Sequence, residues 1–394
     1  MLNPDYIRDM CRKLRLTAQE MEDDIIAAII ALLLAMSETD VVNITEASRI
    51  MSEITEHYRV LGIREIRHII RDSVMENVQT EQQAYTQAEQ AIEQQAAQQP
   101  AGGAEQPGEQ PGSPANDLYG GQRIGTEVPK YPMHDPYIRN VVEHVDRQTE
   151  GTWNNITQTQ AYSGVQRYVE LVDRAVLETA IGEKSWNKAR QDAIDELVQN
   201  GVPTVTSGTS GRTESAATAA ERNTRTAVSR LSGDITLEMA KKNGITLVLV
   251  SAHYGARPSH RPWQGKVFSI VGKTEKYDDF YTATEYGTML GLCGINCRHS
   301  FSAFVEGMNN PYEGKDYNDP QRYNDEQKQR ALERNIRYLR RKKKALQEEN
   351  KSQKTDETRQ KLQAVNKKLK DAVAEYEKFC EDHDFRPLWE RTKG

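Results

Sequence analysis

Ile245-Thr-Leu-Val-Leu-Val-Ser251 decides the fold class, because this run of β-branched and apolar residues is the best strand candidate in the chain. Shorter strands are expected at residues 266–271 and 299–305. Elsewhere the apolar residues recur at helical spacing. The sequence therefore predicts a predominantly helical α+β protein in which residues 214–310 form a small α+β domain.

The part of the chain before this domain carries helical patterns. Residues 1–78 are expected to form an all-helical N-terminal module with breaks at residues 43–45 and at Gly62, and residues 137–213 a further helical region. The apolar run from Ile25 to Met36 is shorter than the roughly 20 residues that a membrane span requires. It predicts a helix that is buried on several sides.

A change of composition separates these two helical regions. Residues 79–136 are rich first in Gln and Ala and then in Pro and Gly. Such a segment buries too little apolar surface to offset the entropy of ordering it. We predict a flexible tether here, with a helical start.

Helical spacing also surrounds the strands on both sides of the domain. A long helix is expected from about Glu214 to Lys242, where Asn243-Gly244 ends it. Residues 320–385 carry two amphipathic stripes joined by a short polar segment, and Thr355 is a suitable N-cap for the second. The simplest arrangement is an antiparallel helical hairpin.

The charge balance argues against a dedicated nucleic-acid-binding chain, because the net charge of the 394 residues is -6. The basic stretch from Arg330 to Lys344 is the exception. It suggests non-specific contact with the phosphates of DNA, or else a solvated helix face, which is the commoner meaning of a charge run. The residues that would contact DNA are Arg337, Arg340, Arg341, Lys342, Lys343 and Lys344.

Cysteines and histidines gather in two segments at predicted strand ends. The four cysteines are too few for a disulfide scaffold and fit a reducing compartment. Cys293, Cys297 and His299, completed by His260 or His253, could hold a structural zinc ion. The alternative is a pair of buried, reduced thiols whose neighbouring histidines bond to the loop backbone.

The remaining residues of these loops have structural or binding interpretations. Arg257 and Arg298 could bind a phosphate or carboxylate, or bridge the loops. Trp263 beside Gly265 is expected in the core, and Asn296 belongs to the same cluster. An enzyme with a thiol nucleophile, or a metal-dependent nuclease, would need an orienting carboxylate or an acidic metal ligand at a recognisable spacing. No enzyme and no catalytic residue are therefore predicted.

The two segments resemble the phage minor capsid protein 2 family, which is similar in turn to the Mu F-like phage head morphogenesis proteins. The resemblance rests on long motifs that contain rare residues. They are Ser251-Ala-His-Tyr-Gly-Ala-Arg-Pro-Ser-His260, Trp263-Gln-Gly-Lys-Val-Phe268, Tyr286-Gly-Thr288 and Gly291-Leu-Cys-Gly-Ile-Asn-Cys-Arg-His-Ser300.

This resemblance implies a structural minor capsid (head) protein of a tailed bacteriophage that acts in head assembly at the portal or capsid interior. The expected partners are the portal or major capsid protein, packaged DNA and further copies of the chain, without a membrane or a small-molecule substrate. The expected location is the virion, after assembly in the bacterial cytoplasm. The alternatives are a DNA-processing metalloenzyme or toxin cargo packaged in the head, and a scaffold that is absent from mature particles.

Overall fold

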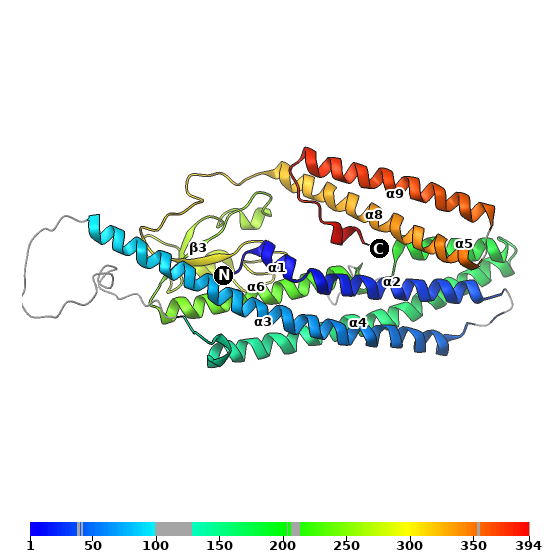
Figure 1. Ribbon diagram of the computed structural model, residues 1–394, viewed down its shortest axis with the longest axis horizontal. Helices are drawn as coiled ribbons and strands as arrows, with labels where there is room; N and C mark the ends of the chain where they lie inside the picture. Colours follow the sequence, from blue (N-terminus) through cyan, green and yellow to red (C-terminus); the bar gives the residue numbers. More distant parts are fainter. Residues whose placement is uncertain are drawn as a thin grey trace, which may run out of the picture. The chain divides into compact units, whose positions relative to one another are not determined.

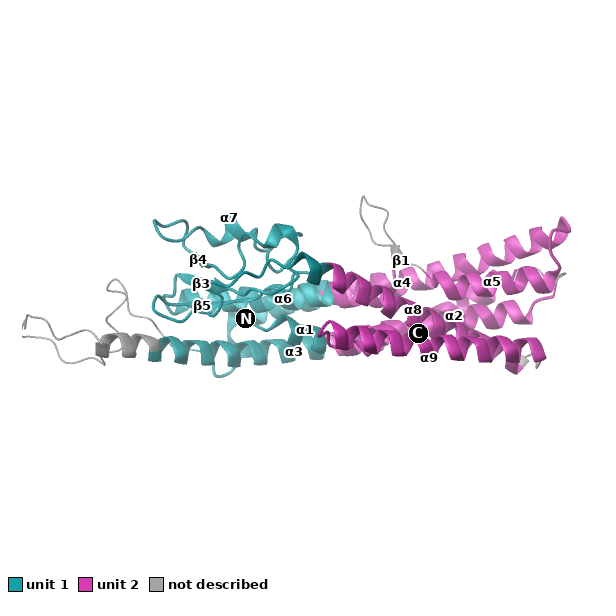
Figure 2. Ribbon diagram, turned by 90° about the horizontal axis from the view of Figure 1, so that it is seen from above, with its two compact units in different colours: residues 1–10, 67–148, 223–323 teal, residues 11–66, 149–222, 324–394 magenta. Residues whose placement is uncertain are grey.

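The computed structural model describes residues 1–37, 40, 42–98, 128–202, 204–205, 213–352 and 355–393 (Figure 1). The fold is predominantly helical with a small three-stranded sheet and a two-stranded ladder in the described residues, so the predicted α+β class is confirmed. The chain divides into two compact units, each assembled from three separate stretches (Figure 2). Unit 1 comprises residues 1–10, 67–148 and 223–323, and unit 2 comprises residues 11–66, 149–222 and 324–394.

The helices of the described ranges include four that contribute residues to both units: α3 (Ile44–Gln98), α4 (Pro136–Ala180), α6 (Ala216–Lys242) and α8 (Pro320–Ser352). The others are α1 (Pro4–Met10), α2 (Arg12–Ala35), α5 (Trp186–Asn200), α7 (Phe280–Thr284) and α9 (Asp356–Asp382). Short 3-10 turns are η2 (Pro132–His134), η3 (Pro258–His260) and η4 (Trp389–Thr392). A two-residue ladder joins β1 (Thr204–Val205) to β2 (Thr213–Glu214), and the predicted loop at residues 207–211 lies outside the described residues.

The sheet of unit 1 confirms the three predicted strands. Its order is β4 (Val267–Ser269), β3 (Leu247–Val250), β5 (Phe301–Phe304), and both pairings are antiparallel. All four residues of β3 are buried, which explains why the strand has no polar alternation. One face packs in a cluster that contains Leu247, Leu249 and Phe304.

The helix α6 covers the other face of this sheet. A Cβ atom at Gly233 would lie 3.2 Å from the ring of Phe301, so helix and strand approach closely there. Hydrogen bonds from α3 hold α6 in turn. Asn77 and Ser232 exchange two of them, and the Thr236 hydroxyl donates to Glu81 at 2.7 Å. The long helix predicted before the strand is thus confirmed, with a packing role.

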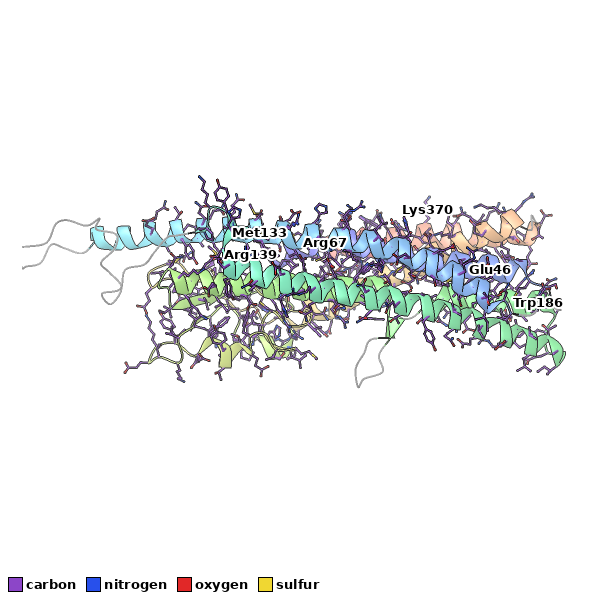
Figure 3. The ribbon with its side chains drawn as sticks, turned by 90° about the horizontal axis from the view of Figure 1, so that it is seen from below. Glu46, Arg67, Met133, Arg139, Trp186 and Lys370 are labelled. Atoms are coloured by element: carbon purple, nitrogen blue, oxygen red, sulfur yellow. The ribbon has the colours of Figure 1, made fainter. Side chains whose placement is uncertain are left out.

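The helix α3 corrects one prediction and extends another (Figure 3, where Glu46 lies near its start). It runs without interruption to Gln98, so the helical start that was predicted for the tether spans residues 79–98. Tyr85 and Ala88 are buried there, and the Ala, Gln and Glu residues around them are good helix formers. At the far end, α4 begins at Pro136. The remainder of the predicted tether, residues 99–127, lies outside the described residues.

Gly62 was predicted as a helix break but lies inside α3. A Cβ atom at this position would come within 2.1 Å of the indole of Trp153 on α4. The Trp153 Nε1–H also donates to the carbonyl of Arg59 at 3.1 Å. The glycine is therefore the point where two helices of unit 2 approach each other most closely around an aromatic side chain.

The other helices of unit 2 follow their sequence patterns. Along α2, the predicted buried run includes Ile25, Ile29 and Leu33, which are fully enclosed. Asn43 caps α3 through its side chain, and α5 ends at Gly201, whose φ is 67°. None of the helices in the described ranges has the length and apolar character needed to cross a bilayer.

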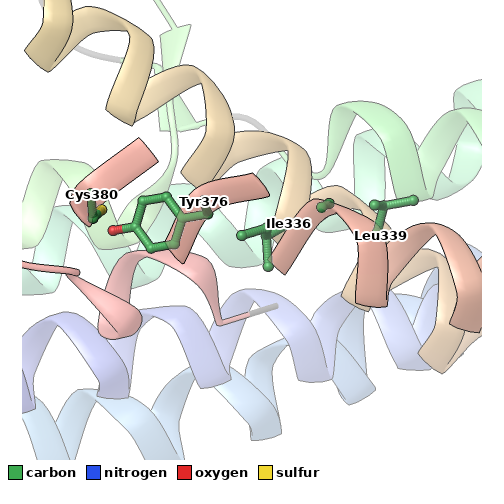
Figure 4. Packing of buried hydrophobic residues seen from close by; sticks show 5 residues of the cluster. Ile336, Leu339, Tyr376 and Cys380 are labelled. Atoms are coloured by element: carbon green, nitrogen blue, oxygen red, sulfur yellow. The ribbon is translucent and has the colours of Figure 1, made fainter. Parts of the chain in front are cut away.

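The C-terminal helices form the predicted antiparallel hairpin (Figure 1). Tyr376 of α9 donates to Glu333 of α8 at 3.1 Å. Gln329, earlier in α8, lies against Cys380, later in α9, so the two helices run in opposite directions. The Thr355 hydroxyl accepts from the Thr358 amide, as an N-cap should. Figure 4 shows the buried residues between the helices, which are Ile336, Leu339, Ala372, Tyr376 and Cys380.

Candidate metal centre

The two segments rich in His and Cys lie side by side in unit 1, as the sequence predicts. One follows β3 and the other precedes β5, and these strands are neighbours in the sheet. The Ser251 amide donates to the Ser300 carbonyl at 2.8 Å, and the Ser300 amide donates to the Ser251 hydroxyl at 2.9 Å. Sheet pairing therefore brings both loops to one end of the strands.

Three potential ligand atoms converge between the loops. His260 Nδ1 and His299 Nδ1 are 3.4 Å apart, and Cys297 Sγ lies 3.9 Å from the former and 3.8 Å from the latter. All three residues are buried. Among the described residues this is the group of His, Cys, Asp and Glu side chains that is compact enough to hold a metal ion.

The outer nitrogen of each histidine faces an oxygen. His260 Nε2 lies 2.8 Å from the Leu290 carbonyl, and His299 Nε2 lies 3.1 Å from Oε1 of Gln264. An imidazole that donates from Nε2 presents a lone pair at Nδ1. Both lone pairs then point at the space shared with Cys297. Hydrogen bonds of this kind orient histidines that bind metals.

Arg257 makes a contact that opposes this tautomer of His260. Its Nε–H points at His260 Nε2 at 2.8 Å, whereas the Leu290 carbonyl at the same distance can only accept. The guanidinium is flexible, has five N–H groups and also donates through Nη2 to the Ile295 carbonyl at 2.9 Å. The Leu290 carbonyl is fixed in the loop backbone. We therefore assign the Nε2 proton of His260 to the bond with Leu290.

Burial keeps the two imidazoles neutral. It lowers the pKa of His260 to about 4, despite the opposing hydrogen bond to Leu290, and lowers the pKa of His299 well below its usual value. Burial also raises the pKa of the Cys297 thiol. Neutral imidazole is the form that binds a metal, and a cation is what would stabilise the thiolate.

Cys293 and His253 were predicted as ligands and lie outside the compact group. The Cys293 thiol is fully buried and points toward Sδ of Met1 at 3.9 Å. The ring of His253 stacks on His299 with 4.3 Å between centroids, and its Nδ1 bonds to the Tyr254 carbonyl. Cys293 also has a positive φ of 60°.

The other predicted residues of these loops serve packing and backbone geometry. Trp263 is buried, with ring centroids 4.5 Å from His260 and 4.7 Å from His299. Gly265 and Asn296 have positive φ values of 71° and 58°. Arg298 is half-buried beside them. Arg257 bridges the two loops, as one of its two interpretations expects.

Two supporting residues were missed by the sequence reasoning. Gln264 binds His299 through its side chain and also accepts from the His253 amide at 3.2 Å. Tyr286 anchors the second loop to α6 through a 2.8 Å bond to Asp234. Both lie inside the motifs that carry the family resemblance. Membership of these motifs was the sequence signal that could have identified them.

The basic stretch on α8 was interpreted as a DNA contact or a solvated helix face, but some of its arginines bond to other parts of the chain. Arg337 donates to the Arg391 carbonyl at 2.8 and 3.1 Å, and Arg340 donates to the carbonyl and hydroxyl of Thr392. Burial, reinforced by other guanidiniums, lowers the pKa of Arg337 to about 10. These arginines hold the C-terminal turn within unit 2.

Arg341 lies still deeper, because only 9% of its side chain is exposed and it pairs with Glu22 at 2.8 Å. A solvated position and an accessible DNA contact are therefore both wrong for Arg341, which is buried. Arg337 and Arg340 are half-buried, and for them contact with DNA stays a prediction. The Nζ atom of Lys342 lies 3.5 Å from Oδ1 of Asp195. For Lys342, Lys343 and Lys344, contact with DNA stays a prediction.

Comparison with known proteins places the chain in a family. The family model for phage minor capsid protein 2 matches residues 121–374, which is more than half of the sequence. A protein of Lactococcus phage LL-H described as "Structural protein" is 25% identical over 276 residues, covering 64% of this chain and 73% of that protein. No solved structure matches the chain. The match spans both loops of the candidate centre, and the chain belongs to the phage minor capsid protein 2 family.

Proposed function

We propose that this phage structural protein acts in head assembly, at the portal or on the capsid interior, as a minor component of the virion. The family match over residues 121–374 carries the proposal. The similarity to a structural protein of another phage supports it. Its partners would be the portal or major capsid protein, and its place of assembly the bacterial cytoplasm.

The chemistry of the loops favours a structural role over catalysis. Cys293 and Cys297 are the nucleophiles that the loops offer, but both are buried and burial raises the pKa of both thiols. A reactive cysteine instead needs a low pKa and access to substrate. The polar groups around them, such as Arg257 and Gln264, bind other parts of the loops. The alternative of a packaged enzyme or toxin therefore receives less support.

The second loop carries an exposed apolar surface that suits contact with another protein. Met289 is 65% exposed and Leu290 is 61% exposed. With Tyr281 and Tyr286, they line a shallow hollow of about 540 Å³. The backbone of this loop is held from within by the bonds of Tyr286 and Leu290. A rigid loop with apolar side chains on its outside favours docking at low entropic cost.

The proposal is tested in phage particles that carry a tagged copy of this gene in place of the natural one. We expect the chain in purified virions, and we expect chemical cross-linking to join it to the portal or major capsid protein. Combining Met289→Asp with Leu290→Asp should reduce incorporation. Tyr162→Asp, at a similarly exposed position of unit 2, should not.

Two results would contradict this function. If the chain is found in infected cells but is missing from purified particles, it is a scaffold or a non-structural protein. If particles that lack the chain assemble and package DNA as well as wild type, it has no role in head assembly.

A further inference from the structure

We propose that His260 Nδ1, His299 Nδ1 and Cys297 Sγ together bind one zinc ion, which ties the loop after β3 to the loop before β5. The inference concerns this chain's own residues. It goes beyond the assembly role proposed above and does not depend on it. Three observations carry it: the spacing of the ligand atoms, the orientation of the histidines and the number of protons available among them.

The spacing of the three atoms matches the edges of a tetrahedral zinc site. Zinc binds histidine nitrogen at about 2.0–2.1 Å and thiolate sulfur at about 2.3 Å. At the tetrahedral angle, these bond lengths place two nitrogens about 3.4 Å apart and a nitrogen and a sulfur about 3.6 Å apart. The distance from His260 Nδ1 to His299 Nδ1 is 3.4 Å, and those to Cys297 Sγ are 3.8 and 3.9 Å.

The orientation of both histidines is the one that metal binding requires. Leu290 O and Gln264 Oε1 each accept from a Nε2–H group, so both Nδ1 lone pairs point inward. The sulfur of Cys297 accepts the amide of His299 at 3.4 Å. Such N–H···S contacts stabilise a negatively charged sulfur. Each of the three ligands therefore has a supporting partner on its outer side.

Counting protons distinguishes a metal site from a hydrogen-bonded cluster. With both Nε2 atoms protonated, the Cys297 S–H is the proton left for the two inward nitrogens. It satisfies one of them and leaves the lone pair of the other without a donor, 3.4 Å from the first nitrogen in a buried place. An unsatisfied buried acceptor costs roughly 1–3 kcal/mol. A zinc ion removes this mismatch, because it accepts all three electron pairs and displaces the thiol proton to solvent.

The donor set favours zinc over other common cations. Two imidazoles and a thiolate are too soft for magnesium or calcium, which prefer oxygen ligands. Zinc accepts this mixture in tetrahedral geometry, and with three protein ligands it takes a water as the fourth. Because the ligands come from two loops, binding would add directly to the stability of unit 1.

Metal content and cobalt spectra of the purified full-length chain test the proposal. After expression with added zinc, wild type should contain about one zinc per chain. Cys297→Ala and His299→Ala should contain little. Cys293→Ala is the matched control, because Cys293 is buried in the same loop but lies outside the three-ligand group. It should retain zinc. Cobalt exchanged into wild type and Cys293→Ala should show thiolate-to-metal absorption, and this band should be lost in Cys297→Ala.

Removal of zinc by a chelator should lower the melting temperature of wild type, and added zinc should restore it. The wild-type protein decides the question even if a variant fails to fold. Zinc content at background after incubation with excess zinc would overturn the proposal. Equal loss of zinc in Cys293→Ala and Cys297→Ala would overturn this ligand set. Either failure would leave the assembly role intact, since that is measured by incorporation into particles.

Discussion

Arg341 is a buried cation on α8 whose partners come from α2. Its guanidinium lies 2.8 Å from Glu22 and 3.4 Å from Asp23. Burial raises the pKa of Asp23, although Arg341 favours the charged form of this carboxyl group. Glu22 is closer to the guanidinium and is its main partner. Only 2% of the Glu22 side chain is exposed. Without Arg341, a charge would remain buried without compensation.

We therefore expect Arg341→Met to lower the free energy of unfolding by about 3–5 kcal/mol, the usual cost of breaking a buried ion pair. Urea unfolding followed by circular dichroism measures it. The matched control is Arg49→Met, since Arg49 is 54% exposed and pairs with Glu46 and Glu53. Exposed pairs contribute about 0–1 kcal/mol. Equal effects of the two substitutions would contradict the assignment.

Glu333 gives unit 2 a dependence on pH. Burial raises its pKa, although Arg391, the Tyr376 hydroxyl, Arg15 and Arg337 all favour the charged form. In the window between the unfolded and folded pKa values, the folded state holds a proton that the unfolded state has lost. The contribution of Glu333 to stability is therefore fully present below the unfolded pKa, and it falls as the pH rises through the folded pKa.

Glu333→Gln should therefore match wild type in acid, where both side chains are neutral, and exceed it in stability near neutral pH. The glutamine keeps an acceptor for Tyr376, which donates to Glu333 at 3.1 Å. Urea titrations at several pH values measure the difference. A variant that becomes less stable than wild type as the pH rises would show that the Arg391 pair outweighs the burial cost.

At this scale, the sequence identified the chemistry but not every partner. The motif placed His260, Cys297 and His299 in loops at strand ends, and the structure brings them together. Cys293 looked equivalent to Cys297, because spacing along the chain does not reveal a positive φ. The arginines of α8 looked exposed for a similar reason, since their partners are distant in sequence.

The contact between α3 and α4 in unit 2 depends on the glycine at position 62. The nearest atoms of Trp153 leave no room for a Cβ atom, and Trp153 is only 1% exposed. Gly62→Ala should therefore force the two helices apart or displace the indole. We expect a loss of about 1–3 kcal/mol, as for other overpacked cores.

A second glycine provides the control for this substitution. Gly151 lies in α4 with open space where a Cβ atom would be. Gly151→Ala should raise helix stability by about 0.5–1 kcal/mol, because alanine is the better helix former. Thermal unfolding of both variants measures the contrast. If Gly62→Ala also stabilised the protein, the close approach of the helices would be refuted.

Elements were predicted where the signal is local and missed where it is not. The three strands, the helix cap at Thr355, the helix end before Asn243-Gly244 and the C-terminal hairpin follow from short patterns. The uninterrupted course of α3 through Gly62 does not, because a glycine at that position reads as a break. A packing partner far along the chain, Trp153, overrode this local preference.

The arrangement of the chain in units leads to a prediction about fragments. The predicted domain, residues 214–310, omits the part of α3 that bonds to α6 through Asn77 and Glu81. It also omits the Leu2 amide, which donates to Ser232 at 2.8 Å. Expressed alone, this fragment should lack the cooperative thermal transition of the full chain in circular dichroism. A sharp transition would show that residues 214–310 fold without the rest of unit 1.

The sequence predicted the family and the fold class of the whole molecule. It did not predict that the chain divides into two units of three stretches each. Long motifs around Cys297 carry the resemblance that the family match confirms. Periodicity assigned each segment to a helix or strand, and contiguous domains were the natural assumption. Helices that supply residues to both units have no signature in hydrophobic spacing, because each part shows the same period.

Six alternating stretches make up the two units, so five passages of the chain connect them. Unit 1 receives its last stretch only when Tyr323 has been synthesised, and unit 2 only with the C-terminal residues. At roughly 5–20 residues per second, the earliest helices leave the ribosome on the order of tens of seconds before their partners exist. Apolar surfaces such as that of α2 must stay unaggregated during this interval. Folding is thus largely completed after translation, so any factor that keeps these surfaces from aggregating would raise the yield of folded protein.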